Sequence, residues 1–204
     1  MTSHSSSQLF QLYSKHAPDW HGNVTKLGYP DAYAHLFSLC PALAGGAAVL
    51  DVGTGSGAFA QAQATFAPTC ATFTLMDNNA EMLDAAHRTA ASFAQTTTLV
   101  KSEIGAPLGQ FDRIICAHVI EHLPAPLAAL DWFYKSLKPG GHLVMAVSRP
   151  HWCTSLIAWK WGHRAFRPAQ VRSMLTSVRF EAPKAIPFPA GPPRRTSCGY
   201  VVGK

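Results

Sequence analysis

The sequence has few charged residues and no closely spaced cysteine pair. Only 14% of its 204 residues are charged, whereas 48% are hydrophobic. The five cysteines are scattered and include no C-x-x-C pair, so neither a disulfide framework nor a cysteine zinc site is indicated. This composition is typical of a compact α/β domain with both faces of its sheet covered, in a reducing compartment.

Long apolar runs are missing too. No uninterrupted apolar stretch approaches the roughly 20 residues that a membrane-spanning helix needs, and the first seven residues lack the basic and apolar segments of a secretory leader. The formal charge of +6 favours anionic partners, yet the basic residues are spread out apart from pairs such as Arg194-Arg195, which indicates a solvated surface. We therefore expect a cytoplasmic protein that does not span a membrane.

Apolar runs alternate with helical patterns from residue 47 onwards, which predicts βαβ units and a mostly parallel sheet. The strands are expected at Ala47–Val52, Thr72–Asp77, Thr98–Lys101, Arg113–Ala117 and His142–Ser148, with weaker ones at Phe180–Phe188 and Cys198–Gly203. We expect residues 1–46 to form an aromatic-rich helical extension that either covers the cleft as a lid or packs on the core. Residues 47–204 form the main part of a single structural domain. The proline-rich stretch Pro183–Pro193 is interpreted as a surface connection.

A glycine-dense turn follows the first predicted strand. Gly53, Gly55 and Gly57 lie between Val52 and helix-forming residues, where glycine lets the backbone approach a ligand and the next helix offers free N–H groups. Gly53-x-Gly55-x-x-Ala58 also satisfies the relaxed dinucleotide fingerprint. The turn alone therefore leaves a nicotinamide enzyme open beside other Rossmann-like cofactor binders.

Polar residues follow each of the first five predicted strands. In an open α/β sheet, ligands collect at the carboxyl ends of the strands, and the residues found there are Asp51 with the glycine turn, Asp77-Asn78, Ser102-Glu103-Ile104, Ala117-His118 and Ser148–His151. Asp77 follows Asp51 by 26 residues, close to the spacing at which an acidic side chain binds ribose hydroxyls. We expect Asn78 to cap the following helix and Glu81 to complete a capping box, which leaves Asp77 for the ribose.

Four segments of the chain resemble the class I S-adenosylmethionine-dependent methyltransferases, particularly the small enzymes of ubiquinone and menaquinone biosynthesis. They are Val49–Gly57, Met76–Leu83, Phe111–Leu123 and Leu137–Gly141. The likeness implies a Rossmann-like three-layer αβα sandwich with a mostly parallel seven-stranded sheet and an antiparallel last strand. It also makes a nicotinamide cofactor less favoured, because the Asp51-x-Gly53 prefix and the Pro139-Gly140-Gly141 turn belong to the methyltransferase pattern.

The resemblance also implies roles for individual residues toward S-adenosyl-L-methionine and its product S-adenosyl-L-homocysteine. Asp51 and the turn of Gly53, Thr54, Gly55 and Gly57 would hold the methionine part, and Asp77, next to Asn78, would hold the ribose. Ser102, Glu103 and Ile104 would surround the adenine. Ala117 and His118 would border the sulfonium.

Methyl transfer is an in-line displacement in which positioning and exclusion of water supply much of the acceleration. A base helps when the acceptor is a hydroxyl or an acidic carbon, and His118 is the first candidate for it, followed by His151 and Glu121. A purely structural hydrogen bond is an equal alternative for His118.

The run His118-Val119-Ile120-Glu121-His122 matches the zinc-peptidase pattern H-x-x-E-H. Peptidase function is rejected, because the segment leaves a strand and Pro124 and Pro126 follow it. Some methyltransferases resemble this region with E-x-x-E-H as metal ligands. Here His118 replaces the first glutamate, which disfavours Mg²⁺, and we predict no metal site.

The segment from His151 to Arg164 is rich in aromatic and basic residues, and we expect it to shape the acceptor pocket. Stacking on Trp152, Trp159 or Trp161 would suit a planar aromatic acceptor. The sequence thus predicts a methyltransferase acting on a small molecule. An RNA or other macromolecule methyltransferase and a non-catalytic S-adenosylmethionine-binding protein are the alternatives, and an oxidoreductase ranks last.

Overall fold

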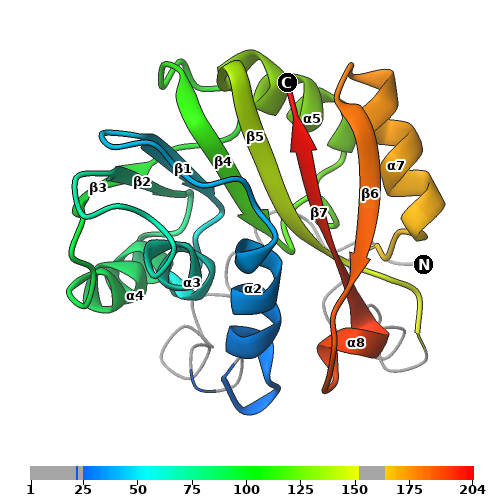
Figure 1. The fold of residues 1–204 in the computed structure, drawn as a ribbon, viewed down its shortest axis with the longest axis horizontal. Helices are drawn as coiled ribbons and strands as arrows, with labels where there is room; N and C mark the ends of the chain where they lie inside the picture. Colours follow the sequence, from blue (N-terminus) through cyan, green and yellow to red (C-terminus); the bar gives the residue numbers. More distant parts are fainter. Residues whose placement is uncertain (1–21, 23–24, 152–163) are drawn as a thin grey trace.

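The computed structural model describes residue 22 and residues 25–151 and 164–204. Helices and strands alternate along most of the chain, and two strands follow one another without a helix between residues 101 and 111 (Figure 1). The strands are β1 (Ala48–Val52), β2 (Thr72–Asp77), β3 (Thr96–Lys101), β4 (Phe111–Ala117), β5 (Leu137–Ser148), β6 (Glu181–Pro187) and β7 (Ser197–Gly203). The helices named here are α2 (Tyr29–Ser38), α3 (Ala58–Ala64), α4 (Ala80–Ala90), α5 (Pro126–Ser136), α7 (Pro168–Ser177) and α8 (Pro193–Thr196).

The strands form one seven-stranded sheet in the order β3-β2-β1-β4-β5-β7-β6. The pairs from β3 to β5 are parallel, and β7 runs antiparallel to both β5 and β6. The order reverses between β1 and β4, where an open α/β sheet forms a ligand crevice at its carboxyl edge. The predicted mostly parallel sheet with an antiparallel last strand is confirmed.

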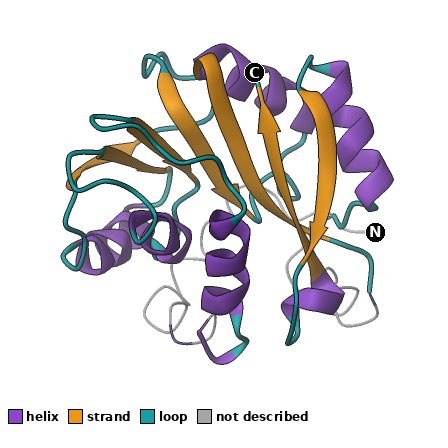
Figure 2. Ribbon diagram, in the orientation of Figure 1, coloured by secondary structure: helices purple, strands orange, loops and turns teal. Residues whose placement is uncertain are grey.

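Helices cover both faces of this sheet (Figure 2). Along β1, Val49 packs in one apolar cluster with α2, α3 and α4, whereas Leu50 and Val52 pack in the other with α5 and α7. Alternate residues of a strand point to opposite faces, so the apolar run of β1 supplies both cores. The predicted three-layer αβα architecture follows from this double burial.

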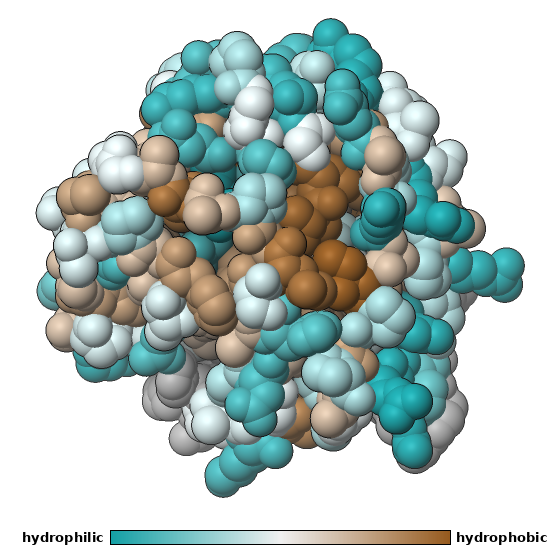
Figure 3. Space-filling view, in the orientation of Figure 1, coloured by the Kyte–Doolittle hydropathy of each residue, from teal (hydrophilic) through white to brown (hydrophobic). Residues whose placement is uncertain are grey.

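The aromatic residues of α2 belong to the first of these clusters. Tyr33 and Phe37 are buried against Phe59 of α3, with ring centroids 4.7 Å apart in both pairs. On the same face, apolar side chains gather over β5 and β7 beside α2 (Figure 3). The partly buried Ile186 of β6 and Val201 of β7 pack against this buried cluster. Among the described residues, no helix is long and apolar enough to cross a membrane.

Three local predictions need correction. The cap of α4 is Asn79, whose side chain accepts a hydrogen bond from the backbone nitrogen of Met82, so Asn78 and Glu81 do not form the expected capping box. The residues between Leu137 and His142, expected to be a turn, form an irregular start of β5 with a register shift opposite Phe111 and Arg113. Pro183 and Pro187 lie in β6, and this is tolerated because β6 is an edge strand.

Candidate active site

A cleft of about 1770 Å³ lies along the carboxyl edge of the sheet. It is lined by the segments that follow β1, β2, β3, β4 and β5. Most of the residues expected at the site line it: Gly53, Thr54, Gly55, Asp77, Asn78, Ser102, Glu103, Ile104, Ala117, His118 and His151. Asp51, Gly57 and Glu121 lie outside the lining and support it from behind.

Hydrogen bonds join the glycine turn to the end of β2. The backbone nitrogen of Thr54 donates to the carbonyl of Met76 at 2.9 Å, and that of Gly55 donates to Oδ2 of Asp77 at 3.0 Å. Gly53 has a φ of 64°, and a Cβ added there would lie 2.4 Å from Cγ2 of Val119. Only glycine fits this position without displacing Val119.

Asp77 joins the turn to the start of α4. Its Oδ1 atom accepts a hydrogen bond of 3.0 Å from the backbone nitrogen of Asn79, while its Oδ2 atom bonds Gly55. Burial raises the pKa of Asp77, an effect that the backbone N–H groups of Asn79, Gly55 and Asn78 partly offset. An ionised carboxylate has about four acceptor positions, so each oxygen retains capacity for a ligand hydroxyl.

Asp51 lies beneath the turn and is only 1% exposed. Its Oδ2 atom accepts a hydrogen bond of 2.7 Å from the hydroxyl of Thr54, and burial raises its pKa to about 7. Gly57 precedes α3 with a φ of 79°, and a Cβ there would press on Thr89 and Ala86 of α4. Both residues therefore shape the turn without forming the wall of the cleft.

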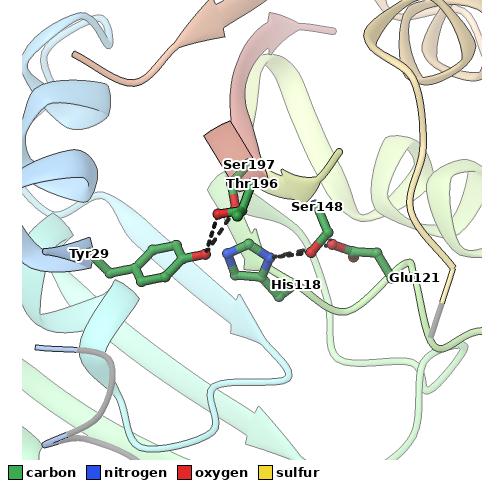
Figure 4. Close-up of polar contacts among 6 residues, drawn as sticks. All are labelled: Tyr29, His118, Glu121, Ser148, Thr196 and Ser197. Atoms are coloured by element: carbon green, nitrogen blue, oxygen red, sulfur yellow. Dashed lines mark hydrogen bonds and ion pairs between the residues drawn. The ribbon is translucent and has the colours of Figure 1, made fainter. Parts of the chain in front are cut away.

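His118 follows β4 with a left-handed backbone, φ 57°. This conformation is costly for a non-glycine residue, and a hydrogen bond of 2.8 Å from its backbone nitrogen to the carbonyl of Ala146 holds it. Its Nδ1 atom lies 3.1 Å from Oγ of Ser148 and 3.4 Å from Oε1 of Glu121. The ring packs edge-on against Tyr29, with centroids 5.3 Å apart (Figure 4).

Glu121 is 1% exposed and lies behind His118. Its Oε1 atom accepts a hydrogen bond of 2.5 Å from the backbone nitrogen of Ser148. Burial opposes its ionisation, but the hydrogen bond and charge of His118, the Ser148 N–H and the charge of His122 outweigh burial and lower the pKa of Glu121. The carboxyl is therefore anionic at neutral pH, even though it has no contact with the cleft.

Tyr29 of α2 and Thr196 of α8 also line the cleft. Tyr29 is one of the aromatic residues of the N-terminal extension, for which the sequence left a lid open, whereas Thr196 and its neighbour Ser197 of β7 were not predicted at the site. The hydroxyl of Tyr29 lies 2.9 Å from Oγ of Ser197 and 3.5 Å from Oγ1 of Thr196 (Figure 4). Because β7 is antiparallel, its first residue Ser197 pairs with Ser148, the last residue of β5. The sequence signal for the position of Ser197 was the predicted direction of the last strand.

In the described part of the chain, no three His, Cys, Asp or Glu side chains are arranged to hold a metal ion. The expected acceptor-side residues Trp152, Trp159, Trp161 and His163 lie outside the described residues.

Comparison with known proteins identifies the family. Residues 27–187 match the model of a methyltransferase domain family. The chain belongs to this family. A ubiquinone biosynthesis O-methyltransferase of Psychrobacter arcticus is 34% identical over 134 residues, which is 63% of this chain and 50% of that protein. The chain spans about half the length of the first curated relatives that it matches.

Solved methyltransferase structures share the fold. A SAM-dependent methyltransferase from Aquifex aeolicus has a TM-score of 0.67 and 18% identity, with 98% of each chain covered. The N-methyltransferase NodS from Bradyrhizobium japonicum, solved with S-adenosyl-L-homocysteine, has a TM-score of 0.63 and 22% identity, covering 84% of this chain and 85% of that one. At these identities the comparisons establish the common Rossmann-like fold of this methyltransferase domain.

Proposed function

We propose that this methyltransferase-family protein transfers a methyl group from S-adenosyl-L-methionine to a small-molecule acceptor. The observation that carries the proposal is the cleft that joins the glycine turn and Asp77 to His118. The relatives named as O-methyltransferases of ubiquinone biosynthesis favour an acceptor hydroxyl on a small molecule. The proposal includes a cytoplasmic location and a division into an extension of residues 1–46 and a catalytic part of residues 47–204.

The residues present fit the cofactor. Gly55 lines the cleft with a φ of 53°, and the atom nearest to an added Cβ would be the carbonyl oxygen of Gly53 at 4.0 Å, so this glycine leaves room for a ligand to approach the turn. Asp77 keeps acceptor capacity for ribose hydroxyls, while Ser102, Glu103 and Ile104 follow the neighbouring strand as a wall for the adenine. S-adenosyl-L-methionine supplies an electrophilic methyl group when bound. The protein orients the acceptor against that methyl and excludes water from the reacting atoms.

The candidate catalytic residues have different positions. His118 and His151 line the cleft, so either can meet an acceptor. Glu121 contacts Nδ1 of His118 and is closed off from the cleft. We therefore assign proton acceptance to His118 and keep His151 as the second candidate.

Calorimetric titration of the purified protein with S-adenosyl-L-homocysteine tests the cofactor, with NAD⁺ titrated in parallel. We expect saturable one-site binding of S-adenosyl-L-homocysteine and no binding of NAD⁺. This result would warrant a screen of methyl acceptors with labelled S-adenosyl-L-methionine. No binding by folded protein would refute the proposal, and selective binding of NAD⁺ would favour an oxidoreductase. Cofactor binding without transfer to any acceptor would instead indicate a non-catalytic binding protein.

A further inference from the structure

The ring of His118 is contacted very differently at its two nitrogens. Nδ1 faces Oγ of Ser148 at 3.1 Å, a hydroxyl that can donate or accept, and Oε1 of Glu121 at 3.4 Å, which can only accept when the carboxyl is ionised. Nε2 is buried and has no hydrogen-bond partner in the described part of the chain. A buried nitrogen without a partner requires an explanation, because leaving such a group unsatisfied costs about 1–3 kcal/mol.

The carboxylate beside Nδ1 favours one form of the neutral ring, and the Ser148 hydroxyl can accept from that form. The carboxylate of Glu121 can only accept hydrogen bonds when ionised, so the proton of the neutral imidazole is favoured on Nδ1. The Ser148 backbone N–H holds Oε1 of Glu121 from the other side, at 2.5 Å. With its proton on Nδ1, His118 presents Nε2 as a lone pair.

We propose that Glu121 is a positioning residue, which keeps His118 in the Nδ1–H form so that Nε2 accepts the proton of an acceptor hydroxyl. This inference rests on the proposed methyl transfer and specifies its acceptor atom as oxygen. The acceptor O–H bond breaks as its oxygen bonds to the methyl carbon. The carbon–sulfur bond breaks with its electron pair left on sulfur, and the proton goes to Nε2.

Charge balances in this step. The positive charge of the sulfonium disappears and an imidazolium of equal charge forms at His118, beside the buried carboxylate of Glu121. An opposite charge at this distance stabilises the imidazolium and costs no reorganisation, because Glu121 is already held by the Ser148 N–H. The left-handed backbone of His118 is consistent with such a site, since strained residues persist where the surroundings hold them.

Tyr29 stands on the Nε2 side of the His118 ring (Figure 4). Its hydroxyl is held by Ser197 at the start of β7. Nε2 has almost no exposed surface in this arrangement, so an acceptor hydroxyl reaches it only when a neighbouring group moves.

Nitrogen-15 NMR of the histidine rings tests the assignment without any acceptor. At a pH where the ring is neutral, the wild-type protein should show His118 with a protonated Nδ1 and an unprotonated Nε2, and a His118→Gln variant identifies the signal. Glu121→Gln should shift His118 toward a mixture of the two forms, because the Gln amide can donate as well as accept. The exposed Glu181→Gln variant is the matched control and should leave the spectrum unchanged.

A wild-type His118 protonated on Nε2 would overturn the inference, and so would an unchanged spectrum in Glu121→Gln. The wild-type spectrum decides even where Glu121→Gln fails to fold. The parallel titration with S-adenosyl-L-homocysteine tests cofactor binding independently, so a failure of this inference can be told apart from a failure of the proposed function. Once an acceptor is known, Glu121→Gln should lower kcat about tenfold or more and leave the Kd of S-adenosyl-L-homocysteine within about threefold of the wild-type value.

Discussion

Oδ2 of Asp77 accepts a hydrogen bond of 3.0 Å from the backbone nitrogen of Gly55, which joins the end of β2 to the turn after β1. The proposed ribose contact uses the same carboxylate. Asp77→Ala removes both functions, so the Kd of S-adenosyl-L-homocysteine should rise about tenfold to a hundredfold, as expected for a loss of about 1.5–3 kcal/mol. Calorimetric titration measures the change.

The exposed Asp84 on the outer face of α4 provides the control for Asp77. Asp84→Ala removes a carboxylate of the same type outside the cleft and should leave the Kd unchanged. Equal affinities of wild-type and Asp77→Ala proteins would remove the ribose assignment.

Gly53 is the position of the turn where a side chain is excluded most strictly. In Gly53→Ala the new methyl group meets Val119 at 2.4 Å and the backbone stays at φ 64°. We expect a loss of unfolding free energy of about 2–4 kcal/mol, the sum of left-handed strain and overpacking, together with weaker binding of S-adenosyl-L-homocysteine. Urea unfolding and calorimetry measure the two effects.

A Gly140→Ala variant separates left-handed strain from overpacking against Val119. The φ of Gly140 is 75°, yet no atom lies within 4 Å of an added Cβ, so Gly140→Ala should cost only the strain, about 1–2 kcal/mol. Adding Val119→Ala to Gly53→Ala should recover part of the loss by removing the clash. If the unfolding free energy is not recovered, the loss in Gly53→Ala comes from backbone strain and not from the clash with Val119.

The sequence predicted the parts of the fold that depend on local pattern. The apolar run ending at Val52 and its glycine turn, and the alternating elements up to Ser148, appear where expected within a few residues. Adjacent Asn78 and Asn79 both suit a helix cap, and only the actual start of α4 at Ala80 decides between them. Local propensity does not contain that information.

Contacts between distant segments could not be predicted in the same way. Tyr29 and Ser197 are 168 residues apart, and His118 and Ser148 are 30 apart. Their proximity follows from strand order and register, which place Ser197 opposite Ser148. For the same reason the sequence ranked Glu121 as a residue of the cleft, whereas the turn after β4 directs its carboxylate toward the backbone of β5.

The buried carboxyl of Asp51 should make stability depend on pH. Its pKa is raised from 3.8 to about 7 in the folded protein, so between about pH 4 and pH 7 the folded state binds more protons than the unfolded state. Stability from this group is therefore present at low pH and is lost as pH rises toward 7. Three pKa units correspond to at most about 4 kcal/mol.

Asp51→Asn isolates this effect, because asparagine does not ionise. Urea unfolding of both proteins at pH 4.5 and pH 8 should show the variant gaining stability relative to wild type by roughly 2–4 kcal/mol at the higher pH. Parallel pH profiles for the two proteins would contradict an elevated pKa at Asp51.

The hydroxyl of Tyr29 ties α2 to the first residue of β7, at 2.9 Å from the fully buried Ser197. A double-mutant cycle of Tyr29→Phe, Ser197→Ala and the combined variant measures this bond by urea unfolding. Phe keeps the ring beside His118, so only the contacts of the hydroxyl with Ser197 and Thr196 are lost. Each single variant should lose about 1 kcal/mol or more, with a coupling energy of about 1 kcal/mol. Additive losses within about 0.3–0.5 kcal/mol would mean that Ser197 does not hold Tyr29. The position of the Tyr29 ring beside His118 would then rest on ring packing alone.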